Sequence, residues 1–178
     1  MDLLNAMRTR IREYKLQGDK TIAKLAPEEL HHVPAGGSNS IAIIIRHLHG
    51  NMLSRWTNFL TEDGEKEWRN RDDEFETIIS DKETLLQLWE KGWQVYLDAM
   101  DNLTTDDLQR TITIRNEPLI VADALVRQLL HYAAHVGQIV YLGKMIRGDA
   151  WETLSIPKKG SEQWNKTMAA KFEKGAHQ

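Results

Sequence analysis

Residues 121–147 form one segment in which apolar side chains recur at helical spacing on nearly every side. No proline falls inside this segment, so nothing in it breaks a helix in the way that proline does. A helix that is apolar nearly all round must be covered by neighbouring helices or by a second subunit, because burying apolar surface is favourable and exposing it to water is not. The segment therefore requires a fold in which other helices surround it.

Further amphipathic helices are predicted where apolar residues recur at steps of three and four, in residues 4–25, 41–60 and 82–103. Pro27 and a run of histidine, proline and glycine at 31–37 separate the first two helices, and residues 38–40 offer side-chain oxygens that cap the second. Asp81 is expected to cap the third helix. Four long helices predict an all-α four-helix bundle, and the long connections after the second and third helices allow topologies other than simple up-and-down.

Two shorter features complete the predicted fold. Short β-favouring runs between Thr111 and Ile120 predict an extended excursion or small hairpin that connects to the last long helix. The tail at 149–178 contains a short apolar pattern at helical spacing, and we expect it to form a small helix that packs on the bundle. Residues 1–178 are thus predicted to form a single domain.

Composition excludes several classes of function. With 41% hydrophobic and 28% charged residues the chain is of the ordinary globular type, and a net charge of -3 gives no positive field for nucleic acid. The absence of cysteine excludes disulfides, thiolate nucleophiles and cysteine-bound zinc, and agrees with a cytoplasmic location. Neither a signal peptide nor eighteen consecutive apolar residues is present, so we expect a protein that is neither exported nor membrane-spanning.

The chemistry is predicted to lie on the last long helix, where His131 and His135 are four residues apart on one face, with their Cβ atoms about 5 to 6 Å apart. Both lie in the apolar stripe that should face the bundle interior, and Gln128 and Gln138 lie on the same side. A buried polar group without a partner costs about 1 to 3 kcal/mol, so these imidazoles need one. A divalent metal ion would satisfy both; the alternative is that each histidine hydrogen-bonds across the core.

A third ligand is expected from the second helix, which carries two histidines on opposite flanks of its apolar face. At most one of His47 and His49 can face the same cavity as the histidine pair. Asn51 and Arg55 continue the line of His47, so polar residues cluster on that side. This clustering favours His47 as the site residue and places His49 at the surface or at an interface.

Two segments resemble the DinB/YfiT-like superfamily of four-helix bundles, in particular a bacterial branch with a His-Leu-x-Gly-Asn motif. The first is His-Leu-His-Gly-Asn at 47–51, and the second is His-Tyr-Ala-Ala-His-Val-Gly-Gln-Ile at 131–139. The resemblance implies that His47, His131 and His135 are metal ligands and that His49 occupies the variable position of the first motif. It further implies a homodimer, and the better understood relatives are thiol-dependent transferases or isomerases.

Three neutral imidazoles leave the charge of a divalent ion uncompensated and at least one coordination position open, as in catalytic zinc sites. Zinc and nickel both suit imidazole ligands. We therefore expect a metal-dependent enzyme that acts on a small molecule, by thiol transfer or by hydrolysis at the metal. The alternative is a non-catalytic, dimeric metal-binding or stress-response protein.

Two regions bear on partners and access. A second apolar flank on the last long helix, beyond the histidine stripe, could face a partner subunit in the expected homodimer; it consists of Leu125, Leu129, Val136 and Val140.

The connection at 61–80 is long for a compact domain and contains eight acidic and three basic residues. Most of it is interpreted as a solvated connector, and by resemblance part of it frames the mouth of the site.

Overall fold

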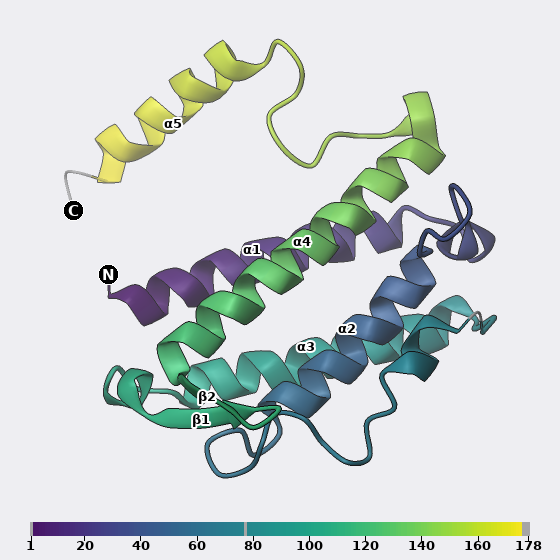
Figure 1. Ribbon diagram of the computed structural model, residues 1–178. Helices are drawn as coiled ribbons and strands as arrows, with labels where there is room; N and C mark the ends of the chain where they lie inside the picture. The colour runs from purple at the N-terminus through teal and green to yellow at the C-terminus, as the bar shows by residue number, and fades with distance from the viewer. Residues whose placement is uncertain (1, 77, 176–178) are drawn as a thin grey trace. The chain divides into compact units, whose positions relative to one another are not determined.

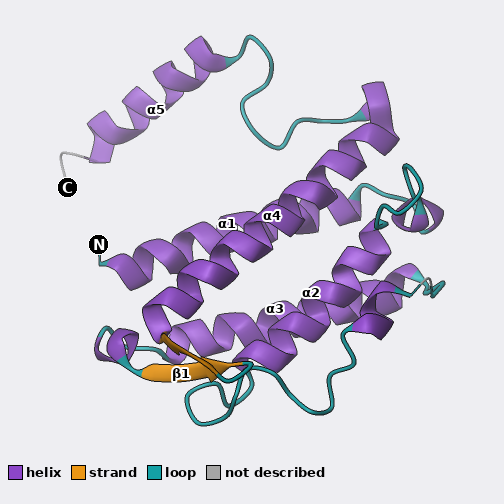
Figure 2. Ribbon diagram, in the orientation of Figure 1, coloured by secondary structure: helices purple, strands orange, loops and turns teal. Residues whose placement is uncertain are grey.

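The computed structural model describes residues 2–76 and 78–175, which are mostly helical (Figures 1 and 2). The helices are α1 (Leu3–Ala23), α2 (Ile41–Trp56), α3 (Lys82–Asn102), α4 (Val121–Arg147) and α5 (Ser161–Gly175). The strands β1 (Thr111–Ile114) and β2 (Glu117–Ile120) pair antiparallel as one small hairpin. The predictions of an all-α fold and of a hairpin before the last long helix are confirmed.

Helices α2 and α3 begin at the predicted caps, and α2 ends earlier than predicted. The side chains of Ser40 and Asp81 accept hydrogen bonds from backbone N–H groups in the first turns of α2 and α3. The prediction that α2 continues to Leu60 is wrong, because the helix ends at Trp56 and Asn58 takes a φ of 50° in the left-handed region. Phe59 nevertheless remains buried, which explains why its apolar spacing resembled a continuing helix.

The chain divides into two compact units, at Arg147, and the bundle is the first of them. Within the bundle α2 and α3 run in the same direction, since His49 contacts Leu88 and the ring of Trp56 packs on that of Tyr96. Helix α4 runs antiparallel to α2, and α1 runs antiparallel to α3 (Figure 1). The topology is therefore up-down-down-up, and the connection from α2 to α3 must return the chain along the length of the bundle.

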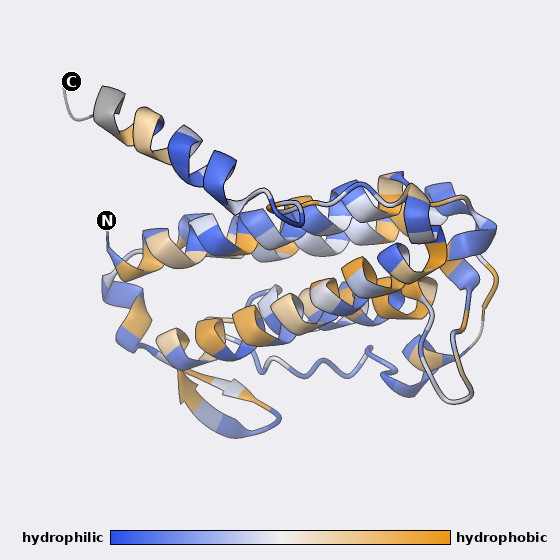
Figure 3. Cartoon of the chain, turned by 90° about the horizontal axis from the view of Figure 1, so that it is seen from above, coloured by the Kyte–Doolittle hydropathy of each residue, from blue (hydrophilic) through white to orange (hydrophobic). Residues whose placement is uncertain are grey.

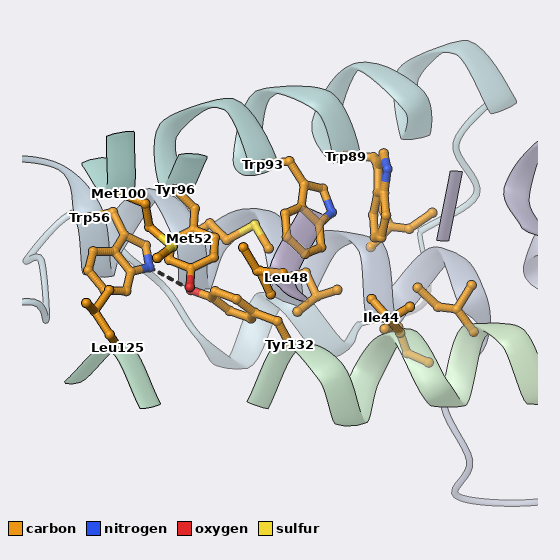
Figure 4. Close-up of a cluster of buried hydrophobic side chains, with 14 of the residues drawn as sticks. Ile44, Leu48, Met52, Trp56, Trp89, Trp93, Tyr96, Met100, Leu125 and Tyr132 are labelled. Atoms are coloured by element: carbon orange, nitrogen blue, oxygen red, sulfur yellow. Dashed lines mark hydrogen bonds between the residues drawn. The ribbon is translucent and has the colours of Figure 1, made fainter. Parts of the chain in front are cut away.

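Aromatic side chains fill the centre of the bundle (Figure 4). The rings of Trp56, Tyr96 and Tyr132 pack with centroids 4.9 Å apart in successive pairs, and Trp93 adds a further contact to Tyr132 at 5.9 Å. The hydropathy colouring shows the alternation of hydrophobic and hydrophilic residues along each helix that this core requires (Figure 3). The structure thus buries the stripes that the sequence periodicity predicts.

The second apolar flank of α4 is used inside the chain. Leu125 and Val136 are fully buried, while Leu129 and Val140 are partly buried against the same core. The prediction that this flank is free for a partner subunit is wrong, because sequence spacing cannot distinguish a helix of the same chain from one of another. The homodimer itself stays a prediction, without support from this flank.

Two further expectations concern membrane-spanning helices and the tail at 149–178. In the described part of the chain no helix has both the length and the apolar character needed to cross a membrane. The tail forms the predicted short helix, α5, and its packing on the bundle stays a prediction.

A buried hydrogen-bonded triad offers a test of the packing between α2 and α4. The Tyr132 hydroxyl donates to Asn51 Oδ1 over 3.0 Å and accepts from Trp56 Nε1 over 2.9 Å. Tyr132→Phe should lower the free energy of unfolding by roughly 2 to 4 kcal/mol in urea denaturation, because both partners would remain buried and unpaired. Tyr141→Phe, at a 70% exposed position of the same helix, should change it by less than about 0.5 kcal/mol. Equal losses in the two variants would contradict the prediction.

Candidate metal centre

Three histidines from two facing helices converge at one point of the bundle. His47 of α2 and His131 and His135 of α4 each offer one ring nitrogen, and these atoms lie within 4.8 Å of one another. His47 is buried, whereas the two histidines of α4 are partly exposed, so the cluster is open on the α4 side. The structure therefore brings together the three histidines that the sequence singled out.

His49 lies outside this cluster. Its Nδ1 is 2.8 Å from the backbone oxygen of Leu88, so the ring is held between α2 and α3. The expectation that at most one of the two histidines of α2 faces the site is confirmed. His49 is partly exposed at the edge of the contact between α2 and α3, so it lies near the surface as expected.

The geometry of the cluster fits a divalent ion. The Nε2 atoms of His47 and His131 are 3.3 Å apart. Two imidazole nitrogens bound to one tetrahedral zinc ion at about 2.0 to 2.1 Å lie about 3.3 to 3.4 Å from each other. The separation that is already present would therefore change little when both nitrogens bind the same ion.

Hydrogen bonds on the far side of two rings direct their free nitrogens toward the centre. Nδ1 of His47 donates to Glu74 Oε2 over 2.9 Å, and Nδ1 of His135 donates to Gln138 Oε1 over 2.8 Å. Both acceptors are oxygens, so Nδ1 carries the proton and Nε2 keeps a lone pair for a metal. Gln138, predicted as a site-lining residue, is exposed and orients His135.

A glycine explains how Glu74 reaches a buried histidine. Glu74 lies in a short 3₁₀ turn, Asp72–Phe75, within the connection between α2 and α3. Its carboxylate occupies the space beside Gly50, where any Cβ atom would overlap it. The glycine of the His-Leu-His-Gly-Asn motif thus makes room for the residue that binds the histidine three positions earlier. Glu74 is absent from the site residues predicted from the sequence; the available signal is a glycine inside an apolar helix, which marks a close approach.

Arginines hold the carboxylates of this connection in place. Arg69 donates from Nε and Nη2 to the two oxygens of Glu74, over 2.8 and 2.9 Å. Glu65 Oε2 accepts from Arg55 and from Arg115, both over 2.9 Å, and lies 4.0 Å from Arg69 Nη1. Arg55, predicted to line the site, thus belongs to an ion-pair network beside it. These contacts place part of the 61–80 connection behind His47, and its expected role at the mouth of the site stays a prediction.

The two remaining predicted lining residues are buried between α2 and α4. Asn51 accepts the hydroxyl of Tyr132 and so serves the packing of the two helices. Gln128 is 3% exposed, and its Oε1 has no hydrogen-bond partner among the residues that the structure describes. Asn51 is therefore satisfied inside the fold, whereas Gln128 retains an unused polar atom.

The electrostatics keep the histidines of α4 neutral and Glu74 charged. Burial, with smaller effects from His135, His47 and two arginines, lowers the pKa of His131 to about 3. Burial also lowers the pKa of His135, against an opposing hydrogen bond to Gln138. Burial alone would raise the pKa of Glu74, but hydrogen bonds from His47 and Arg69 hold it below its ordinary value. Neutral imidazoles with an anionic carboxylate behind them are the state that binds a metal.

Comparisons with known proteins place the chain in a family. Residues 1–160 match the family described as "Protein of unknown function (DUF1572)". The chain belongs to this family. A solved structure, described as "Crystal structure of the conserved protein of locus from Enterococcus faecalis", is similar with a TM-score of 0.63 and 16% identity, over 84% of this chain and 99% of that one. At that identity the likeness shows the DUF1572 chain's fold alone, and no curated protein matches the chain.

The depressed pKa of His131 predicts how the metal-free protein responds to acid. The unfolded chain binds a proton at His131 near pH 6.5, whereas the folded chain does so only near pH 3. Stability from this residue is therefore complete above about pH 6.5 and is lost as the pH falls toward about 3. In chelator-treated protein, His131→Gln should flatten the decline of melting temperature over this range. His32→Gln, at an exposed position, serves as the control, and an unchanged slope in His131→Gln would refute the prediction.

Proposed function

We propose that the protein binds one divalent metal ion through His47, His131 and His135 and uses it in a reaction on a small molecule, by thiol transfer or by hydrolysis. The observation that carries the proposal is the convergence of three ring nitrogens within 4.8 Å. The resemblance of the 47–51 and 131–139 motifs to DinB/YfiT-like proteins supports the same ligand set. Zinc and nickel are the ions that we expect.

The residues around the ligands would position them. A bound zinc or nickel ion would supply a Lewis acid with at least one open coordination position. Glu74 would fix the ring of His47, Gln138 would fix that of His135, and Arg69 would hold Glu74. Both oxygens of Glu74 are engaged by these contacts, so we assign it a positioning role and not that of a general base.

One observation favours the alternative of a non-catalytic metal-binding protein. Among the described residues, the carboxylates of the network beside the histidines, Glu74 and Glu65, are both paired with arginines.

The experiment that decides between the enzyme and the alternative compares metal-loaded and chelator-treated protein on panels of esters and of thiol acceptors. Turnover that requires the metal and is lost in His135→Ala supports the enzyme, whereas metal binding without any turnover supports the alternative.

The ligand assignment predicts the effect of single substitutions. His47→Ala, His131→Ala and His135→Ala should each lower zinc affinity by more than about 100-fold. Loss of a residue that only orients a ligand costs up to about 100-fold, and loss of the ligand itself should cost more. Metal content of untagged protein and competition with a chelating dye measure this. His49→Ala should keep the affinity of the unmodified protein, because His49 binds Leu88 instead. Full retention of metal in His131→Ala would overturn the assignment.

The role of Glu74 predicts a smaller effect from two different substitutions. Glu74→Ala removes the partner of His47 Nδ1, and Gly50→Ala displaces that partner by placing a Cβ atom in its space. Each should lower zinc affinity by about 10- to 100-fold in the same competition assay. Gly137→Ala is the matched control, since it adds a Cβ to a helix beside a ligand where no atom lies within 4 Å. If Gly50→Ala and Gly137→Ala bind zinc equally well, Glu74 does not position the ligand.

A further inference from the structure

Buried polar atoms without partners lie next to the metal centre. Within the described residues, Nε of Arg55, Nη1 of Arg69 and Oε1 of Gln128 are buried and make no hydrogen bond. The side chains of Arg55 and Arg69 are only 6% and 2% exposed, so solvent reaches little of either guanidinium. An unpaired buried N–H of a charged group is costly, and proteins rarely leave one without a use.

Arg69 and Gln128 lie close to the histidines, and Arg55 lies farther along α2. Arg69 donates to Glu74, which accepts from His47, so only one carboxylate separates this guanidinium from a ligand. Arg55 follows His47 on α2 by eight residues, and Gln128 precedes His131 on α4 by three, about one turn. Arg55 and Arg69 lie within 4.0 Å of the same oxygen of Glu65, which places the two guanidiniums side by side.

The charges of the network do not balance once a metal is present. The two buried guanidiniums, of Arg55 and Arg69, are matched by the carboxylates of Glu65 and Glu74, while Arg115 is 54% exposed and solvated. A divalent ion on neutral imidazoles adds two positive charges that no ligand offsets. Excess positive charge in a mostly buried site is stable only when an anion compensates it.

We propose that the small molecule used by the metal centre carries a carboxylate, which the free N–H groups of Arg55 and Arg69 bind. This inference rests on the proposed metal-dependent function. Two guanidiniums with one free donor each match the two oxygens of a carboxylate, and charge-assisted bonds of this kind are strong. A phosphate would leave its remaining oxygens without donors in this set. Gln128 would bind a polar group next to the carboxylate, and the metal remains available for the reacting group.

The test compares two molecules of nearly equal shape and different charge, lactate and lactamide. Calorimetry on zinc-loaded protein should show that lactate binds at least about tenfold more tightly, because lactamide cannot form charge-assisted bonds. Arg55→Gln should abolish this preference. Arg115→Gln is the matched control: it removes an ion pair with the same Glu65 oxygen, but its side chain is 54% exposed, and it should keep the preference.

Each outcome separates this inference from the proposed function. Zinc binding without a preference for lactate, or a preference that survives in Arg55→Gln, overturns the inference and leaves the metal site standing. Tighter binding of inorganic phosphate than of lactate overturns the assignment to a carboxylate. Failure to bind zinc overturns the proposed function, and the same comparison on metal-free protein then tests the arginines alone. If Arg55→Gln does not fold, Arg55→Lys keeps the charge without the planar donors, and an undiminished preference there refutes the inference.

Discussion

The parallel packing of α2 and α3 is the constraint on which the rest of the site depends. Trp56 stacks on Tyr96 and His49 binds Leu88, and these contacts hold the two helices in the same direction. Parallel neighbours cannot be joined by a tight turn, so the chain must travel back along the bundle before α3 begins. That return path carries Glu74 to His47. A packing arrangement in the aromatic core thus decides which residues stand behind a candidate metal ligand.

The contact of Glu74 with His47 depends on the two other residues that Glu74 touches, Gly50 and Arg69. Gly50 leaves space on the helix, and Arg69 supplies a counter-charge with two hydrogen bonds. Removing a carboxylate from water costs several kcal/mol, and such a pair is stable only when its geometry is good and its remaining lone pairs are satisfied. Three hydrogen bonds meet that condition here. The ring of His47 is therefore held in place in the metal-free protein, which would reduce the ordering that binding of the proposed ion imposes.

Much of the fold could be predicted because its signals are local. Helical periodicity, side-chain caps and a turn between β-favouring runs located the four long helices and the hairpin, since each depends on residues close in sequence. The end of α2 was misplaced because Phe59 is buried without being helical, and apolar spacing cannot separate the two. For the flank of α4 with Leu125 and Val136, spacing predicts burial without identifying the covering element, so a partner subunit remained a possible cover.

The candidate site shows the same division between local and long-range information. His131 and His135 were predictable because one helical turn separates them, and His47 because Asn51 and Arg55 extend its polar line on one helix. Glu74 was not predictable as one of eight acidic residues in the 61–80 connection, because its role depends on where the return path crosses α2.

The distribution of charge around the histidines limits what the protein's own groups can contribute to chemistry. A general base needs a lone pair that is free to accept a proton from a reacting group. The lone pairs of Glu74 point to His47 and Arg69, and one oxygen of Glu65 meets two arginines. These carboxylates therefore stabilise positive groups, and in the proposed reaction the proton acceptor would be the metal-bound group or the substrate itself. A substrate with its own carboxylate would fit the charge of this site, since it would bring negative charge to arginines that still have free donors.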